Sequence, residues 1–351
     1  TANIEIDFAN MVDIVETDNG SEANFLIEEF YGNLDGDGYR LIFAADTLLD
    51  MDNPYSANIT GLSSLTFTKY FALFETIAPS ATISNLNLYM DIDITDLDST
   101  YALIAPLALY NYGAISGVNV NGLTISRLTG ERNANYIFIG GIVALNYGTI
   151  ENSYNNSDIT FSMPQRLPLY MGYAGIALFN LSEGDYVGTI SNSFNTGNLN
   201  ITASTNNVNI YGSGIVINNA GILERVGNNG NFTIDGTVSC AAYFTGVALY
   251  SEGGSLSYCY NNGQFTGSTS ASLYSAGIAY TLNSGTINYL VDTQGYALAV
   301  ISRSSPTDTG TNYAGVSSGT TVINAVELTT VTIDCGGGYY LRIQGSSGSY
   351  V

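Results

Sequence analysis

The chain has 351 residues, of which 30 are acidic and 8 are basic, and its formal net charge is −22. This acidic balance argues against nucleic acid or an anionic membrane as the partner. The sequence contains no histidine, which excludes Ser-His-Asp and Cys-His catalysis and any histidine-ligated metal. The three cysteines are isolated, so zinc is not indicated, and a pairing of Cys240 with Cys259 stays open.

The first stretch that constrains the fold is FYGNLDGDGYRLIF, at residues 30–43. A calcium loop of the EF-hand type that began at Asn33 would need a glutamate at position 44, where the chain has Ala44. We therefore expect the aspartates and glycines of DGDG to form a tight turn that opens a first coil. No cofactor is expected, although calcium at Asp35 and Asp37 stays open as an alternative.

An acidic strand follows at residues 91–98, with the sequence DIDITDLD. In a strand, Asp91 and Asp93 would share one face about 7 Å apart, and the intervening isoleucines would point inward. We interpret this as a solvated strand face. Two alternatives remain, which are a calcium site at Asp91 and Asp93, and a hydrolase in which close carboxylates, with Asp96, cleave a polysaccharide.

The body of the chain is built from repeats. PLALYNYGAI at residues 106–115 is followed by GIVALNYGTI at 141–150. Further copies start at Gly175, Gly214, Gly246 and Gly277. Each unit holds three short segments in which apolar and polar residues alternate, separated by Asn/Gly turns, a pattern typical of strands. The charge-free run at residues 101–126 contains several asparagines and glycines, so we do not expect it to be a membrane helix.

We therefore predict an all-β, single-domain parallel β-helix, or β-solenoid, of about eight three-strand coils with terminal caps. The first apolar strand of each unit should point Ile142 and Ala144, and their equivalents, into the core, and leave Gly141 and Val143 outside. The predicted parts are an N-terminal cap at 1–29, repeats at 30–317 with inserts near 161–173 and 181–187, and a last coil and C-terminal cap at 318–351. Recurrent Asn85, Asn152, Asn192 and Asn288 should form a structural asparagine ladder.

The repeat resembles the GLUG motif of β-helix surface proteins. That motif has the form GGIVGxNxGTIxNSYNxGxV, and residues 140–159 of this chain are GGIVALNYGTIENSYNNSDI. The opening segment at residues 30–41 is similar to the entry segment of the same proteins. The resemblance covers roughly residues 30–295 and departs from the pattern at the two inserts. It implies a bacterial cell-surface β-helix that is usually adhesive, without naming a ligand.

Tyrosine is the most informative residue type, because the chain has 27 tyrosines and no tryptophan. One tyrosine precedes the start of each clear repeat by an odd number of residues, which in an unbroken strand puts it on the outer face. These residues are Tyr101, Tyr136, Tyr170, Tyr211, Tyr243 and Tyr274. In stacked coils they would form a flat aromatic strip that suits the faces of sugar rings, although a purely structural strand ladder would have the same sequence.

The function expected from these features is non-catalytic, extracellular adhesion at a cell surface. The partner would be an insoluble, cellulose-like plant polysaccharide bound by the tyrosine strip, and the chain is expected to be a monomer. In architecture and composition the chain also resembles tapirin-type cellulose-binding adhesins. Two alternatives stay open, which are a β-helix polysaccharide hydrolase or lyase, and a structural or protein-binding stalk whose tyrosines are packed under the inserts.

Overall fold

The computed structural model describes residues 27–57, 65–95, 97, 101–128, 136–163, 170–203, 208–236, 240–268, 271–283, 285–296, 298–304, 307–308, 331–334 and 340–343. Within these ranges all regular structure is β-strand. Accordingly, this part of the chain contains no helix of the length and apolarity needed to cross a membrane.

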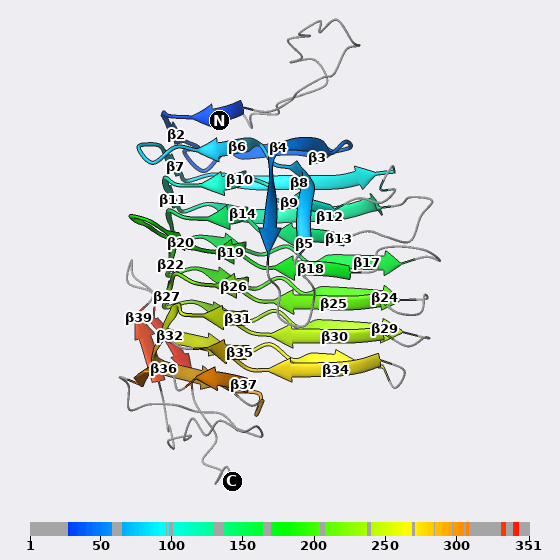
Figure 1. Ribbon diagram of the computed structural model, residues 1–351, viewed down its shortest axis with the longest axis vertical. Coiled ribbons are helices and arrows are strands. Elements are labelled where there is room, and N and C mark those ends of the chain that lie inside the picture. The colour runs from blue at the N-terminus through cyan, green and yellow to red at the C-terminus, as the bar shows by residue number, and fades with distance from the viewer. Residues whose placement is uncertain are drawn as a thin grey trace, which may run out of the picture.

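The strands form a parallel β-solenoid in which the strands of successive coils stack into shared sheets (Figure 1). A coil begins in sheet C, which contains β34 (Ala271–Ala276), β30 (Cys240–Thr245), β25 (Val208–Ser213), β18 (Tyr170–Ala174), β13 (Tyr136–Gly140), β9 (Tyr101–Ile104), β5 (Leu65–Phe71) and β4 (Leu49–Ala57). The coil continues in sheet A, which contains β1 (Ile27–Phe30), β6 (Phe74–Ile77), β10 (Ala108–Asn111), β14 (Val143–Asn146), β19 (Ala177–Asn180), β26 (Val216–Asn219), β31 (Ala248–Glu252), β35 (Ala279–Asn283) and β37 (Ala299–Ser304).

Each coil then passes through sheet B, in two short steps in most coils. The first step is made by β2 (Asn33–Asp35), β7 (Thr82–Ser84), β11 (Ala114–Ser116), β15 (Thr149–Glu151), β22 (Thr189–Ser191) and β27 (Ile222–Glu224). The second step is made by β3 (Arg40–Ala45), β8 (Asn87–Ile94), β12 (Asn119–Leu128), β16 (Tyr154–Asn155), β23 (Phe194–Asn195) and β28 (Gly227–Asn228). In the later coils a single strand makes both steps, namely β32 (Ser255–Asn261) and β36 (Thr286–Asp292). The short strand β38 (Thr307–Asp308) pairs with β36.

Four coils close with a strand in sheet D before the chain returns to sheet C. These strands are β17 (Ile159–Met163), β24 (Leu199–Ala203), β29 (Phe232–Gly236) and β33 (Phe265–Gly267). Two antiparallel hairpins lie outside the coils, β20 (Ser182–Glu183) with β21 (Tyr186–Val187), and β39 (Val331–Asp334) with β40 (Tyr340–Ile343). The first of these hairpins lies in the segment 181–187, where the repeat pattern is interrupted.

The fold class predicted from the repeats is confirmed, but the solenoid has about six complete turns rather than eight. The six begin with the parallel strands β9, β13, β18, β25, β30 and β34 of sheet C. Above them, β5 is paired on one side with the antiparallel strand β4, so the coil that contains β5 is an end coil. β1, β2 and β3 pair with the strands of that coil and cover it.

The glycine-rich stretch DGDG forms a turn between β2 and β3, as expected. Asp37 has a φ of 47° and Gly38 a φ of 75°, in the left-handed region that tight turns use. The Asp35 carboxylate accepts hydrogen bonds from the Asp37 backbone N–H at 3.0 Å and from the Asn85 amide at 3.1 Å. Within the described ranges no cluster of three or more metal-binding side chains occurs.

The lumen of the solenoid is filled by aliphatic and aromatic side chains from every sheet. One member of each predicted inward pair, such as Ile142 or Ile176, is fully buried in this core. The other member of each pair lies outside the lumen, because Ala144, Leu178 and their equivalents belong to a second apolar cluster. Val143, expected outside, lies in the lumen instead. A bend at residues 141–142 separates β13 from β14, so the two-residue alternation that the prediction assumed restarts there.

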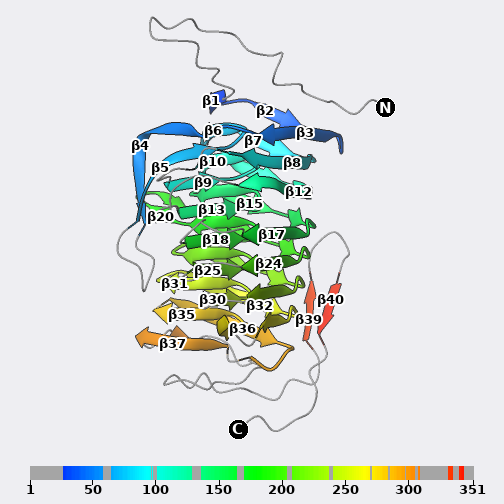
Figure 2. The ribbon, with the colours of Figure 1, turned by 90° about the vertical axis from the view of Figure 1, so that its right-hand side faces the viewer.

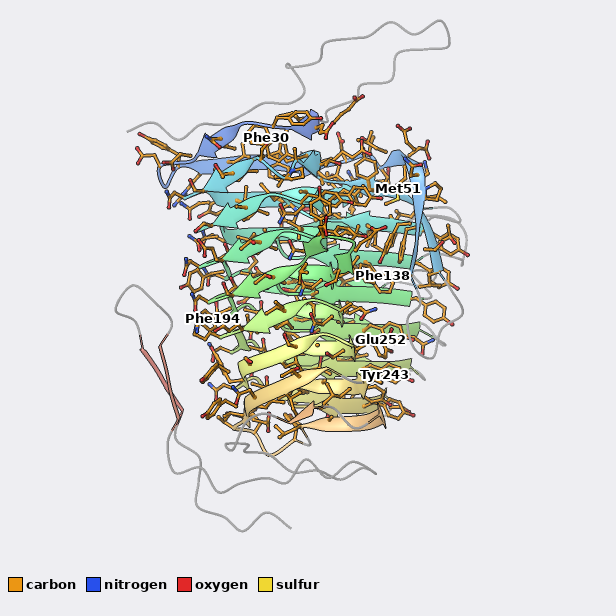
Figure 3. All side chains as sticks on the ribbon, turned by 60° about the vertical axis from the view of Figure 1, so that its left-hand side comes forward. Phe30, Met51, Phe138, Phe194, Tyr243 and Glu252 are labelled. Atoms are coloured by element: carbon orange, nitrogen blue, oxygen red, sulfur yellow. The ribbon has the colours of Figure 1, made fainter. Side chains whose placement is uncertain are left out.

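The second apolar cluster, here called the outer cluster, lies outside the lumen where sheets C and A meet. It includes Phe138, Phe179 and Leu249. An arm made of β4 and the start of β5 runs along the solenoid axis, across the coils, and lies over part of this cluster (Figure 1). Phe67 of the arm contacts Phe138 edge to face, with ring centroids 5.3 Å apart. Figure 3 shows Met51 of the arm on the same side of the solenoid as Phe138 and Tyr243, with Phe194 on the opposite side.

Two ladders of buried asparagine amides stabilise the coils from inside. In the first, Asn111, Asn146, Asn180 and Asn219 each donate Nδ2 to the side-chain oxygen of the next coil, at 2.7–3.4 Å, and the ladder ends at Ser251. In the second, Asn195, Asn228 and Asn261 do the same at 2.8–3.0 Å, and the ladder ends at Asp292. The Oδ1 of Asn228 also accepts the Gly230 N–H, which fixes the orientation of the amide.

The predicted asparagine ladder is only partly correct. Asn85, Asn152 and Asn192 occupy one equivalent turn position, with φ values of 53°, 49° and 46°. In the last coil this position is occupied by Tyr289, with a φ of 51°. Asn288 therefore lies one residue before the equivalent turn position. The buried ladders were not predicted, although a recurring Asn-x-Gly signature marks most of their members. Asn111-Tyr112-Gly113 and Asn228-Asn229-Gly230 are two examples.

Candidate functional site

The six predicted tyrosines form one continuous stacked row on the outer face of sheet C. The ring centroids of successive members are 4.5, 4.6, 6.4, 5.2 and 4.8 Å apart, from Tyr101 to Tyr274. The interplanar angles lie between 4° and 13°. Because the neighbouring Ile137 and Ile210 point into the lumen, the alternation of the strands directs the tyrosines outward, as expected. We call these six residues the tyrosine row.

The widest step in the tyrosine row results from a change of register. Tyr101, Tyr136 and Tyr170 are paired in one column of sheet C. Tyr211, Tyr243 and Tyr274 are paired in another, two residues further along the strands. Gly172 lies opposite Tyr211, and a Cβ atom at Gly172 would lie 2.1 Å from Cδ1 of Phe138. The glycine therefore makes room for Phe138, which stacks toward Tyr211 at 6.5 Å.

The tyrosine row is less exposed than the sequence suggested. Tyr274 is the most exposed of the six, at 43%, whereas Tyr211 is 4% exposed. The remaining four are half-buried, because the rings stack on each other and pack against the outer cluster. Burial raises the pKa of the Tyr136, Tyr211 and Tyr243 hydroxyls above the ordinary tyrosine value. These hydroxyls are therefore neutral hydrogen-bonding groups at physiological pH.

Stacking also decides which part of each ring a ligand can reach. Coils are about 4.8 Å apart, so like residues in successive coils place their rings face to face. Most of each ring face is covered by its neighbour, and the row presents ring edges and hydroxyl groups instead. Tyr274 is the last member of the row. Its far face is not covered by another member.

Asp91 and Asp93 of β8 form a paired, solvent-facing strand surface. In β8, Ile92 and Ile94 are buried while the aspartates between them point outward. Asp93 forms a bidentate ion pair with Arg127, at 2.5 and 2.7 Å, and these hydrogen bonds hold its pKa below the ordinary value. Asp91 accepts hydrogen bonds from Thr124 and Ser126. Asp93 is thus an ionised partner of Arg127 and not a proton donor near neutral pH. Asp96, the third carboxylate of the predicted cluster, lies outside the described residues.

Cys259, the cysteine whose side chain the structure describes, is not a reactive centre. Cys259 is a free, buried thiol, which leaves the possible Cys240–Cys259 disulfide unformed. Its Sγ lies 3.8 Å from the carbonyl oxygen of Leu223, and burial raises its pKa well above the ordinary value. A thiol in this state is a packing group in the lumen.

The fold and the row together define the chain as a parallel β-solenoid with a tyrosine ladder on one outer face. Comparison of the chain with protein-family models, with curated proteins and with solved structures found no match in any of the three. The resemblance to GLUG-motif and tapirin-type adhesins therefore stays a prediction from the sequence.

Proposed function

We propose that this chain is a non-catalytic, extracellular binding domain of a bacterial cell surface, and that it holds an insoluble, cellulose-like polysaccharide along the tyrosine row. The observation that carries the proposal is the continuity of the row. Six tyrosines from six consecutive coils stack without interruption on one outer face. An extended ligand with repeating units is the kind of partner that can contact several exposed members of such a row.

The chemistry of the row favours a neutral glycan over a charged polymer. Tyrosine provides a broad apolar ring and a hydroxyl group at a small cost in side-chain entropy. The outer cluster around the row is made of apolar and tyrosine side chains. A charged ligand would lose hydration there without gaining an ion pair, whereas sugar C–H groups and hydroxyls can pack on ring edges and bond to the tyrosine hydroxyls.

The end of the row that carries Tyr243 and Tyr274 is the candidate for the main contact with a ligand. The arm contacts the coils nearer the N-terminal end, where Tyr55 lies 5.3 Å from Phe179, ring to ring. Tyr274 is the most exposed member of the row. We therefore assign the principal contact to this end, where the exposed ring of Tyr274 can stack on a sugar.

The test is a depletion assay on microcrystalline cellulose, with soluble and charged polysaccharides as competitors and with released reducing ends measured in the same tubes. We expect the wild-type chain to bind cellulose without new reducing ends. The double variant Tyr243→Ala, Tyr274→Ala should lose most of the binding, whereas Tyr243→Phe, Tyr274→Phe should keep the stack and lose less. New reducing ends would show an enzyme, and equal binding by the alanine variant would exclude the tyrosine row as the site.

A structural or protein-binding stalk is the second candidate, and the arm supports it. The arm covers part of the outer cluster with Met51, Phe67 and Ala57, as a segment would that only completes the packing of the fold. In that case the half-buried tyrosines are a stabilising ladder. Removal of Tyr243 and Tyr274 would then lower the unfolding temperature without changing retention on any glycan.

A further inference from the structure

A second outer face of the solenoid carries ordered rows of polar side chains, most of them uncharged. It consists of sheet D and the turn that leads into it, and we call it the Asn/Thr face. The turn row is Asn121, Asn156, Thr196, Asn229, Asn262 and Thr293. Beside it lies the row Asp158, Asn198, Asn231 and Gln264, and then the strand row Thr160, Asn200, Thr233 and Thr266.

The Asn/Thr face is regular because sheet D keeps its register. Thr160, Asn200, Thr233 and Thr266 are paired directly from β17 to β33, with no bulge between them. The residues that alternate with them, such as Ile159, Leu199 and Phe232, are buried in the lumen. The polar side chains are therefore held outward, at about 4.8 Å between strands and about 7 Å along them.

The hydrogen bonds within the rows leave part of each side chain free to bind a ligand. Asn156 donates to the Asn121 amide oxygen at 3.0 Å and accepts from the Thr196 hydroxyl at 2.6 Å. Thr266 and Thr233 share a bond at 3.1 Å. An amide has two N–H donors and two lone pairs on its oxygen, so the exposed Asn156 keeps a donor and an acceptor for a partner. These bonds also hold the side chains in fixed positions, which lowers the entropy cost of binding.

The mixture of fixed donors and acceptors matches hydroxyl groups, which both donate and accept. Two aspartates lie on this face, Asp158 in the second row and the exposed Asp235 two residues beyond Thr233 in β29, and the Asp158 carboxylate accepts hydrogen bonds from the backbone and side-chain N–H groups of Asn198 at 2.8 Å. The face therefore offers no cation to a polyanion. A flat, repeating, hydroxyl-rich surface is the partner that meets many of these groups at once.

We infer that the Asn/Thr face is a second glycan-binding face, and that the solenoid bridges two polysaccharide surfaces. Sheets C and D diverge from a shared corner, with the arm on the side of sheet C (Figure 2). Both sheets turn their inner faces to one lumen, so their outer faces point away from each other and one flat solid cannot lie on both. The class of ligand rests on the proposed function, while the face and its residues are independent of the tyrosine row.

The test compares binding with bridging. Two suspensions of cellulose nanocrystals, labelled with different dyes, are mixed with the protein, and co-aggregation is measured beside simple depletion. The face variant is Asn200→Lys, Thr266→Lys, in which two long charged side chains stand on exposed positions of the strand row. The matched control is Ile222→Lys, Thr286→Lys, which adds the same charges at exposed positions on sheet B.

We expect the wild type and the control to co-aggregate the two suspensions. The face variant should still bind cellulose in simple depletion, but its co-aggregation should be at least about tenfold weaker. Co-aggregation by the face variant at the wild-type level would overturn the inference, as would sedimentation showing that wild type bridges as a dimer through its tyrosine rows. If the alanine variant of Tyr243 and Tyr274 binds at the wild-type level and the face variant does not bind, the tyrosine site fails and the Asn/Thr face stands. If wild type binds no cellulose, both proposals fail.

Discussion

Two asparagine-rich ladders run side by side along the solenoid, one residue apart in the sequence, and only one of them is buried. Asn261 belongs to the inner ladder and is fully buried, whereas Asn262 belongs to the turn row of the Asn/Thr face and is exposed. The same relation holds for Asn195 of the inner ladder, which is buried, and Thr196 of the turn row, which is exposed. Both ladders use side-chain amides that bond from coil to coil.

The difference shows that burial, and not residue type, decides what a ladder does. Inside the protein an amide that loses its partner cannot turn to water, so each inner asparagine is needed for stability. Outside, water replaces a lost partner at little cost. The outer ladder is therefore free to exchange its remaining hydrogen bonds with a ligand, which is why we place a binding face there.

The largest expected effect is the loss of an inner asparagine. Asn261→Ala removes the bonds to Asn228, Asp292 and the backbone of Gly263. Several buried polar atoms lose their partners, and we expect the free energy of unfolding to fall by about 3–5 kcal/mol. Asn262→Ala, one residue later, should change it by less than about 0.5 kcal/mol. Urea unfolding measures both, and similar losses would contradict the comparison.

The next effect concerns the tyrosine row, where apolar packing replaces hydrogen bonds. In Gly172→Ala the new methyl group would overlap the buried Phe138 ring, and overpacking of this kind costs about 2 kcal/mol. The control is Gly267→Ala in sheet D, where the nearest atom to a Cβ is 3.4 Å away. Gly267→Ala should be neutral or slightly stabilising. Thermal unfolding of the two variants tests the difference, and equal melting temperatures would refute it.

The end of the inner ladder predicts a dependence of stability on pH. Burial raises the pKa of Asp292 to about 6, although Asn261 and the backbone of Gln294 and Tyr296 donate to its carboxylate. Since the folded pKa lies above the unfolded value of about 3.9, the folded state binds the proton more tightly. Its stability therefore rises as the pH falls through 6, by about 1 kcal/mol from pH 7 to pH 5.

Comparison of wild type with Asp292→Asn isolates this contribution, because the other carboxylates are unchanged. The variant should lose the increase in stability between pH 7 and pH 5 in urea unfolding at each pH. An unchanged pH profile would show that Asp292 does not titrate in this range.

The smallest effect is expected on the Asn/Thr face itself. The side chain of Thr266 is exposed and shares one hydrogen bond, with the Thr233 hydroxyl. Thr266→Ala should therefore change the free energy of unfolding by less than about 0.5 kcal/mol. The same variant should weaken retention on cellulose measurably if the face binds glycan. A loss of stability above about 1 kcal/mol would instead make the row part of the structural framework.

The sequence was sufficient to predict the fold class and the side of sheet C on which the tyrosines lie, because alternation within one strand is a local property. The sequence was not sufficient to predict how the alternation of side chains continues after a bend in the backbone. Val143 and Ala144, which follow the bend at residues 141–142, were therefore assigned to the wrong sides. The exposure of Tyr211 could not be derived either. It depends on Phe138, Gly172 and the arm, which meet only in the folded chain. The arm itself carries no repeat, and nothing local indicates that it folds across the coils.

The inner ladders also give the solenoid a direction. Every amide from Asn195 to Asn261 donates toward the C-terminal end, so each interior coil needs a residue that both donates and accepts, whereas the terminal residue needs only to accept. Aspartate at 292 meets that requirement. If a coil between Asn195 and Asn261 were duplicated, every amide of the ladder could still donate to the next coil. A coil added beyond Asp292 would receive no hydrogen bond from the Asp292 carboxylate. The C-terminal end of this inner ladder is thus set by the chemistry of one side chain, and an engineer who wished to lengthen the ladder would first change that aspartate to asparagine.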